Sequence, residues 1–188
     1  MRFVLSISVC FLILSCTTKK DLDISKYPII TTAAELSEYY DLKLDKSGEY
    51  ESSAIIKYLD GSKELEYSYD LAETKYFDPL IYYITIQQER SVRDAKEVYV
   101  LGKTAIRLTG NSFNQGTIEI DSLMLPGDEY YYALRTYNDV PNGMFYTVRK
   151  GARIYTMMIS GVYTSDHSLL YDLILPRIES LETYDIRK

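Results

Sequence analysis

Histidine, cysteine and tryptophan are the residue types that this sequence nearly lacks. Its 188 residues include one histidine, His167, two cysteines and no tryptophan. Zinc and most other transition-metal centres use several His or Cys ligands, so we expect no metal site and no cofactor. A catalytic triad built on His167 would have to recruit its neighbours Asp166 and Ser168, which point to different sides at the start of a helix. These shortages argue against an enzyme.

Sequence motifs for phosphate, nucleotide and calcium binding are absent as well. We find no P-loop, no G-x-S-x-G turn, no dinucleotide-binding glycine fingerprint and no twelve-residue calcium loop. Adjacent carboxylates such as Asp128-Glu129 are the groups that a glycosidase uses, but such pairs are common in an acidic chain. The formal net charge is −6, and the longest basic runs have two residues. Because nucleic-acid binding requires clustered Lys and Arg, we expect no nucleic-acid partner.

A single long apolar run is present, and it lies at the start of the chain. It extends over residues 3–14 behind one positive charge, Arg2. A helix needs ~20 residues to span a bilayer core of ~30 Å, so the run is typical of a cleaved export signal rather than of a retained anchor. Residues 13–16, Ile-Leu-Ser-Cys, resemble the lipobox of bacterial lipoproteins. We therefore expect a signal peptide over residues 1–15 and lipidation of Cys16.

The expected processing determines where the mature protein is located. Removal of residues 1–15 takes away one arginine and no acidic residue, so the formal net charge changes from −6 to −7. This charge does not favour electrostatic membrane binding, and stable attachment would come from the acyl chains on Cys16. No other cysteine remains for a disulfide. We expect a lipid-anchored protein of the bacterial cell envelope. Because Thr17 rather than an aspartate follows the cysteine, we expect the outer membrane if the host has one.

The pattern of apolar residues divides the mature chain into a tether and a domain. Residues 16–26 are polar and without periodicity, so we expect the lipidated cysteine to be followed by a flexible tether. Residues 27–188 carry regular patterns and have the length of a single domain. Its first helix is predicted to be capped by Thr31 or Thr32 and to end near Lys43.

Strand and helix signals then alternate along the domain. The dipeptide Asp60-Gly61 predicts a hairpin of strands 51–59 and 63–71. Residues 80–88 are apolar on both sides and predict a central strand. Helical spacing follows over residues 91–110, with two alternatives left open: a break at Gly102, or a short strand over 97–100.

The last third of the chain has the pattern of a meander closed by a helix. Turn signals separate four predicted strands, at 117–125, 130–137, 144–149 and 153–160. A closing helix, capped by Ser165 or Asp166, should be kinked or divided at Pro176. We therefore expect an α+β fold, an antiparallel β-sheet with helices on both faces.

Tyrosine is unusually frequent, with 20 residues against 5 phenylalanines. Aromatic side chains suit a half-buried sheet, and they also suit a binding surface. Tyr131, Arg135 and Tyr137 fall on one face of a predicted strand. If that face is exposed, they form an aromatic platform with a cation that suits a protein or sugar partner. The alternative is that helices cover the face. The basic tip around Arg149-Lys150-Gly151 is interpreted as a solvated turn.

The C-terminal third resembles the Mog1/PsbP-like group of proteins. A strand over 145–149, a strand over 153–161 that ends in Ser160-Gly161, and a helix through Leu169-Leu170 carry this resemblance. It implies an α/β/α sandwich and a non-enzymatic binding or assembly role. The metal-associated histidines of photosynthetic members have no counterpart, since His167 stands alone. We predict a cell-envelope lipoprotein that is a non-catalytic protein-binding or assembly module, with an envelope protein as partner. The alternative is a small-ligand or glycan-binding surface lipoprotein.

Overall fold

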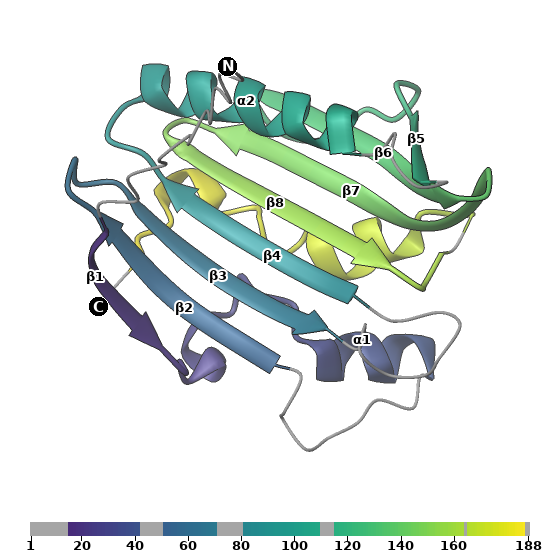
Figure 1. The fold of residues 1–188 in the computed structure, drawn as a ribbon, viewed down its shortest axis with the longest axis horizontal. Coiled ribbons are helices and arrows are strands. Elements are labelled where there is room, and N and C mark those ends of the chain that lie inside the picture. Colours follow the sequence, from purple (N-terminus) through teal and green to yellow (C-terminus); the bar gives the residue numbers. More distant parts are fainter. Residues whose placement is uncertain (1–14, 42–50, 71–80, 110–114, 164, 187–188) are drawn as a thin grey trace, which may run out of the picture.

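An open antiparallel β-sheet forms the body of this α+β protein (Figure 1). The computed structural model describes residues 15–41, 51–70, 81–109, 115–163 and 165–186. Seven strands, β2 to β8, make up the main sheet, and β1 adds an eighth strand at its edge, in the order β1-β2-β3-β4-β8-β7-β6-β5. The strands are β1 (Ser15–Lys20), β2 (Glu51–Tyr58), β3 (Lys63–Asp70), β4 (Ile81–Gln88), β5 (Gln115–Glu119), β6 (Glu129–Tyr137), β7 (Val140–Lys150) and β8 (Arg153–Ser160).

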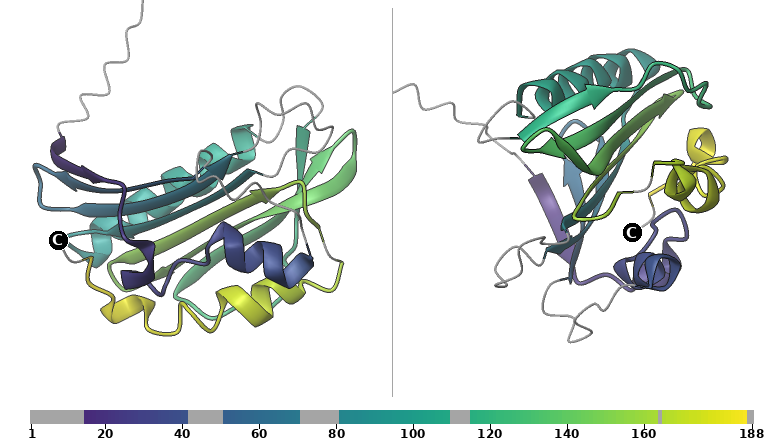
Figure 2. Two further views of the ribbon diagram at one scale, coloured as in Figure 1. Left: turned by 90° about the horizontal axis from the view of Figure 1, so that it is seen from below. Right: turned by 90° about the vertical axis from the view of Figure 1, so that its right-hand side faces the viewer.

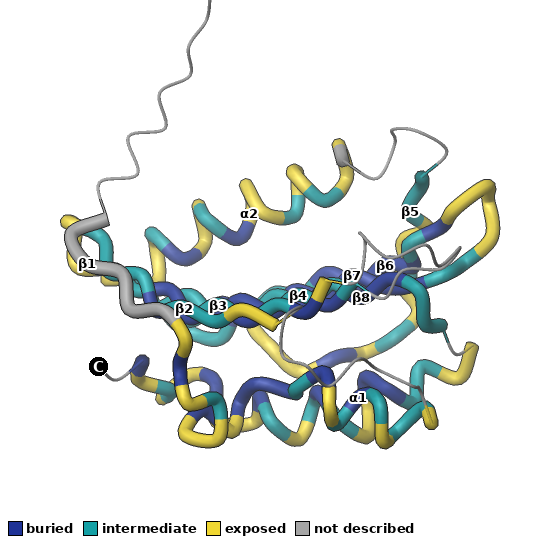
Figure 3. Tube along the Cα trace, turned by 60° about the horizontal axis from the view of Figure 1, so that its bottom comes forward, coloured by how far each residue is buried: buried dark blue, intermediate teal, exposed yellow. Residues whose placement is uncertain are grey.

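Two α-helices and a helical C-terminal segment lie against this sheet. Helix α2 (Val92–Thr109) packs on β7 and β8 from one side, while α1 (Ala33–Tyr40) and the C-terminal segment lie on the other side (Figures 2 and 3). The C-terminal segment contains a π-helical turn, η2 (Leu170–Ile174), and a 3₁₀ turn, η3 (Leu181–Thr183), and another 3₁₀ turn, η1 (Ile24–Lys26), precedes α1. None of the described helices is long and apolar enough to cross a membrane.

The two sides of the sheet are called here the α2 face and the core face. On the core face, alternate residues of five strands are buried under α1 and the C-terminal segment. They include a row of tyrosines, in which Tyr67 and Tyr82 have ring centroids 6.2 Å apart and Tyr146 lies 6.5 Å from both Tyr132 and Tyr155. Much of the tyrosine surplus therefore lies in the core, where rings fit a pleated surface.

Capping residues set the two ends of helix α1: Thr32 at its start and Asp41 at its end. The Thr32 hydroxyl accepts a hydrogen bond from the Glu35 backbone N–H, and the Glu35 carboxylate accepts one from the Thr32 N–H. This reciprocal capping box satisfies two N–H groups that have no partner within the helix. Asp41, in the left-handed region with φ of 53°, ends the helix. The predicted cap at Thr32 is confirmed, and the predicted end near Lys43 lies outside the described residues.

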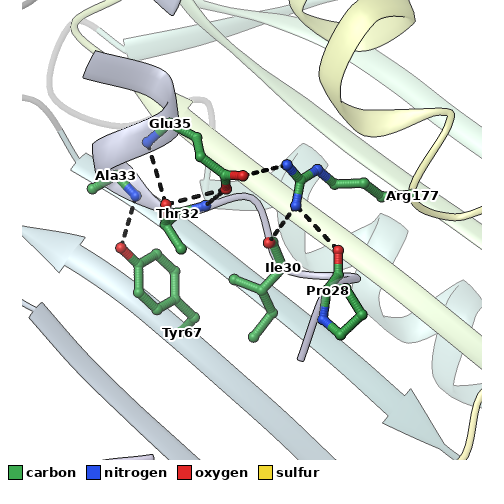
Figure 4. Close-up of polar contacts among 7 residues, drawn as sticks. All are labelled: Pro28, Ile30, Thr32, Ala33, Glu35, Tyr67 and Arg177. Carbon is green, nitrogen blue, oxygen red and sulfur yellow. Dashed lines mark hydrogen bonds and ion pairs between the residues drawn. The ribbon is translucent and has the colours of Figure 1, made fainter. Parts of the chain in front are cut away.

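Arg177 connects the C-terminal segment to the chain that leads into α1 (Figure 4). Its guanidinium donates hydrogen bonds to the carbonyls of Pro28 (3.1 Å) and Ile30 (2.9 Å) and to the Glu35 carboxylate. The hydroxyl of Tyr67 in β3 accepts a hydrogen bond from the Ala33 N–H at 2.8 Å and donates one to the Glu51 carboxylate at 3.1 Å. The start of α1 is thus held by a central strand on one side and by the C-terminal segment on the other.

The predicted secondary structure is largely confirmed through β4 and α2. The hairpin of β2 and β3 turns at Asp60-Gly61 as expected, and β4 lies between β3 and β8 in the middle of the sheet. Ser91 caps α2 through a bond from the Asp94 N–H to its hydroxyl. The helix continues through Gly102, so neither the break at this residue nor a short strand over 97–100 is formed.

Part of the segment that was expected to be a flexible tether belongs to the sheet. Residues 15–20 form β1 along the edge of β2, and the Asp21 N–H then donates to the Ser53 carbonyl at 3.0 Å. Leu22 is buried in the core. An edge strand exposes unpaired N–H and C=O groups, and here the polar segment satisfies those of β2.

Two predictions in the last third of the chain were wrong in detail. The turn between β6 and β7 lies at Asn138-Asp139, both with positive φ as a two-residue hairpin turn requires, so residues 141–143 belong to β7. The predicted interruption of the closing helix at Pro176 is confirmed. Leu175 donates to the Leu170 carbonyl in a π-helical turn, and Pro176, which has no N–H, follows directly. The strand expected over 117–125 ends at Glu119.

Candidate functional site

The predicted aromatic platform is not formed, because α2 covers its centre. Tyr131 is buried beneath α2, with Lys103 5.1 Å and Arg107 5.4 Å from the centre of its ring. Arg135 is half-buried and donates to the Gln115 side chain at 3.0 Å. Only Tyr137 is exposed. The covering apolar stripe of α2 includes Ala95 and Tyr99, which pack with Tyr131 in a small second core.

The basic hairpin tip is engaged within the protein rather than solvated. Arg149 is buried, and its guanidinium donates to Asp128 at 2.7 Å and to Glu129 at 2.6 Å. The Gly151 N–H and then the Arg149 charge lower the pKa of the Asp128 carboxyl, against a smaller opposing effect of burial. Lys150 donates to the Ile178 carbonyl at 3.0 Å, which ties the tip to the C-terminal segment. The adjacent carboxylates noted in the sequence therefore hold a structural arginine.

His167 also has a structural contact. Its Nδ1 lies 2.9 Å from the Tyr132 hydroxyl, and the two rings meet edge to face with centroids 5.3 Å apart. The residue adopts a positive φ of 57° just before the helical C-terminal segment. Asp166 accepts a hydrogen bond from the Ser168 N–H at 3.0 Å. The arrangement differs from a catalytic triad.

A surface that the sequence analysis did not single out is the half of the α2 face over β2, β3 and β4. Helix α2 packs against β7 and β8, and no other described helix or strand covers these three strands on that side (Figure 1). We call this surface the open face. Strand register places on it alternate residues of each strand: Ser52, Ala54, Ile56, Tyr58, Glu64, Glu66, Ser68, Tyr83, Thr85 and Gln87.

Hydroxyl groups on the open face are ordered by cross-strand and nearby hydrogen bonds. The Tyr58 hydroxyl donates to Glu64 at 2.7 Å, and the Tyr83 hydroxyl donates to Glu66 at 3.3 Å. Ser52 and Ser68 share a hydrogen bond of 2.8 Å between their hydroxyls. Apart from the exposed Ser52, these side chains are half-buried or buried, so they present fixed acceptors rather than freely rotating ones. A fixed polar surface requires less ordering on binding.

The charge on the open face is entirely negative. None of its residues is a lysine or an arginine, whereas Glu64 and Glu66 stand two positions apart on β3. Burial, and next the Glu64 charge, raise the pKa of the Glu66 carboxyl. At the end of β4, burial followed by the charges of Asp60, Asp94 and Glu64 raises the pKa of Glu89. Perturbed carboxylates of this kind are concentrated at functional sites.

A pocket of about 440 Å³ lies where the open face meets α2. Asp60, Glu64 and Glu89 contribute its carboxylates, and Leu59 and Val98 form apolar walls. Tyr58, Ser62 and Gln87 complete the lining. Arg90 is at one side, 3.9 Å from Asp60 and 3.4 Å from Asp94. The volume falls in the range of small-ligand or side-chain pockets, which are ~300–1,000 Å³.

The donor set of this region does not suggest a metal centre. In the parts of the chain that the structure describes, no three His, Cys, Asp or Glu side chains are grouped so as to hold a metal ion. The acidic groups of the open face instead suit ammonium or guanidinium donors, which form the stronger, charge-assisted hydrogen bonds.

The open face had a signal in the sequence that periodicity alone could not interpret. Along β3, Glu64, Glu66 and Ser68 alternate with Leu65, Tyr67 and Tyr69. Such alternation predicts one buried and one solvated side, but it does not show that α2 would leave that side uncovered.

Comparisons with models of known protein families, with curated proteins and with solved structures gave no significant match.

Proposed function

We propose that this protein is a bacterial cell-envelope lipoprotein, acylated at Cys16, that acts as a non-catalytic binding module for another envelope protein. The observation that carries the proposal is the open face, which has fixed carboxylates and hydroxyls and no lysine or arginine among the residues of β2, β3 and β4 that define it. The favoured partner is a protein segment that presents Lys or Arg side chains, because opposite charges steer association and set the orientation of the bound segment.

Three features support a binding rather than a catalytic role. His167 and the pair Asp128-Glu129 are held by internal contacts, with Tyr132 and Arg149 respectively. The open face is broad and acidic, and the pocket at its end opens beside α2 instead of enclosing a reacting centre. A surface of this kind can hold an extended segment while a cationic side chain enters the pocket.

The finer fold that we propose is the Mog1/PsbP-like sandwich. The position of α2 on one side of the sheet and of α1 with the C-terminal segment on the other is consistent with it. So is the passage from β8, which ends at Ser160, through Gly161 to the helical segment on the core face. Binding and assembly roles are what this resemblance implies.

A glycan ligand is the second candidate, and one observation favours it. Tyr58 and Tyr83 are half-buried on the open face, next to carboxylates that accept hydrogen bonds. Sugar recognition combines ring faces with a few fixed polar groups. Titration calorimetry of the purified domain with cell-wall fragments tests this directly, since a protein-assembly module should give no heat with any of them.

Site-specific photo-crosslinking in living cells tests the proposed protein partner. A photoreactive residue replaces Ser68 on the open face or, as control, Leu101, which is 68% exposed on α2. We expect one envelope protein to be captured from position 68 and not from 101. Combining the probe with Glu66→Gln and Glu89→Gln should reduce the yield at least several-fold. Equal capture from both positions contradicts the proposal. So does a crosslinking yield that is unchanged by Glu66→Gln and Glu89→Gln.

A further inference from the structure

The lipid attachment site is built into the sheet, without a spacer. Cys16 lies within β1, and Thr17, which directly follows it and remains after cleavage, pairs with Lys57 of β2. The chain stays attached beyond the strand, where the Leu22 N–H donates to the Ser53 hydroxyl at 2.9 Å. A flexible linker would let the domain move freely relative to its anchor, whereas a strand holds the two in one geometry.

The register of the sheet shows which part of the protein adjoins Cys16. Lys57, opposite Thr17, is the second-last residue of β2, just before the β2–β3 turn. Across the sheet, Lys63 pairs with Gln88, and Gln88 with Arg153, so the end of β4 and the β7–β8 turn lie at the same end. Figure 2 shows β1 beginning beside the β2–β3 turn. We call this the Cys16 end.

Two exposed apolar side chains project from the Cys16 end. Leu59, in the β2–β3 turn, is 58% exposed, and Val92, the first residue of α2, is 46% exposed. Arg90 and Arg93 flank Val92 with largely exposed side chains, each of them within 3.4 Å of a carboxylate, Asp94 and Glu97 respectively. Apolar side chains next to arginines are typical of surfaces that lie at the lipid headgroups, because long basic side chains extend their charge to the phosphates.

We propose that, in the acylated protein, the Cys16 end rests on the membrane with Leu59 and Val92 among the lipid headgroups. This inference depends on the acylation that the proposed function assumes. The acyl chains supply the affinity, and the rigid attachment supplies the orientation. The opposite end, at the β6–β7 turn, then points away from the bilayer, about 30 Å along β7 at ~3.3 Å per residue. A partner reaching the pocket would approach along the membrane surface.

Single-cysteine labelling provides the test, because the acylated chain has no other free thiol. Leu59→Cys and Val92→Cys report on the Cys16 end, and Val140→Cys, at the first residue of β7, which is 62% exposed, is the matched control. Each full-length variant is acylated in cells, purified, labelled with a polarity-sensitive fluorophore and placed in phosphatidylethanolamine–phosphatidylglycerol vesicles. We expect blue-shifted emission and at least twofold stronger quenching by headgroup-level lipid quenchers at positions 59 and 92 than at 140.

Vesicle flotation separates the two levels of the proposal. If the protein floats but the fluorophore is quenched equally at all three positions, or most strongly at 140, the proposed membrane contact is wrong and the acylation is still supported. Protein that fails to float overturns the acylation and the contact together. Shielding of position 59 only after envelope proteins are added would assign this end to a protein partner, against the proposal.

Discussion

Replacement of Arg177 by methionine should destabilise the protein by about 2–3 kcal/mol. Methionine keeps the aliphatic stem and removes the donors that Arg177 supplies to the carbonyls of Ile30 and Pro28 and to the Glu35 carboxylate. Ile30 is buried, and an unpaired buried acceptor costs about 1–3 kcal/mol. Pro28 is exposed and Glu35 partly so, hence water replaces much of those bonds, and the ion pair contributes about 0–1 kcal/mol.

Urea unfolding followed by circular dichroism measures this loss. With a denaturant slope of about 2 kcal/mol per molar, the midpoint should fall by roughly 1 M, and the melting temperature by roughly 5–10 °C. The control is Arg93→Met, which removes an exposed ion pair with Glu97 and should cost less than about 0.5 kcal/mol. A loss below 0.5 kcal/mol for Arg177→Met, or equal losses for both variants, would refute the assignment of Arg177 as a tie between segments.

The effect should also depend on pH in a defined direction. Burial disfavours the charge of Glu35, but the Thr32 N–H and Arg177 outweigh it and hold the pKa below the ordinary value of 4.5. A carboxyl with a lowered pKa stabilises the fold above its unfolded value and loses that contribution as pH falls through the folded value. The difference between wild type and Arg177→Met should therefore narrow in acid.

Three further predictions concern the turn, a strand contact and the open face. Arg149→Met should cost about 1–3 kcal/mol in urea unfolding, because the bonds of the buried guanidinium to the Gly151 carbonyl, Asp128 and Glu129 are lost while water solvates the two partly exposed carboxylates; a loss below about 0.5 kcal/mol, as for an exposed pair, would contradict this. Gly143→Ala should abolish or severely weaken folding, since a Cβ there would meet the Ile159 carbonyl oxygen at 2.1 Å, and a native melting curve would count against that close approach. Glu66→Gln should raise the unfolding midpoint at pH 7 and leave it unchanged at pH 4. Because the pKa of Glu66 is raised, the folded state binds the proton more tightly than the unfolded state does. At a pH above the pKa of the folded state, the ionised Glu66 therefore lowers stability. An equal change in the unfolding midpoint at both pH values would contradict the repulsion from Glu64.

Features decided by neighbouring residues could be predicted from the sequence. The cap at Thr32, the turn at Asp60-Gly61 and the cap at Ser91 each depend on side chains within three positions. The strands that these signals separate were correspondingly well placed. Two turn signals close together gave the wrong answer, because Asn138-Asp139 provides the two positive φ angles that residues 141–143 were expected to supply.

The candidate site could not be predicted, because it depends on where α2 lies. The helix was recognised, but its position over β6, β7 and β8 is set by packing between Tyr99 and residues far along the chain, such as Tyr131 and Ile154. That choice buries Tyr131 of the expected platform, and among the described residues it leaves no helix over β2–β4 on that side of the sheet. Likewise, the strand β1 depends on the free edge of β2, about 40 residues later, and no local pattern reports such an edge.

The pairing of β4 with β8 has a consequence for how the chain folds. It joins β1–β4 to β5–β8, and its partners are separated by between 65 positions, for Gln88 with Arg153, and 79 positions, for Ile81 with Ser160. Until the last strand arrives, the first half of the sheet ends in β4, an apolar strand whose outer edge has no partner. Such distant contacts slow folding to the millisecond-to-second range, and an unpaired apolar edge invites aggregation. The sheet therefore cannot close before β8, in the last fifth of the chain, is available to pair with β4.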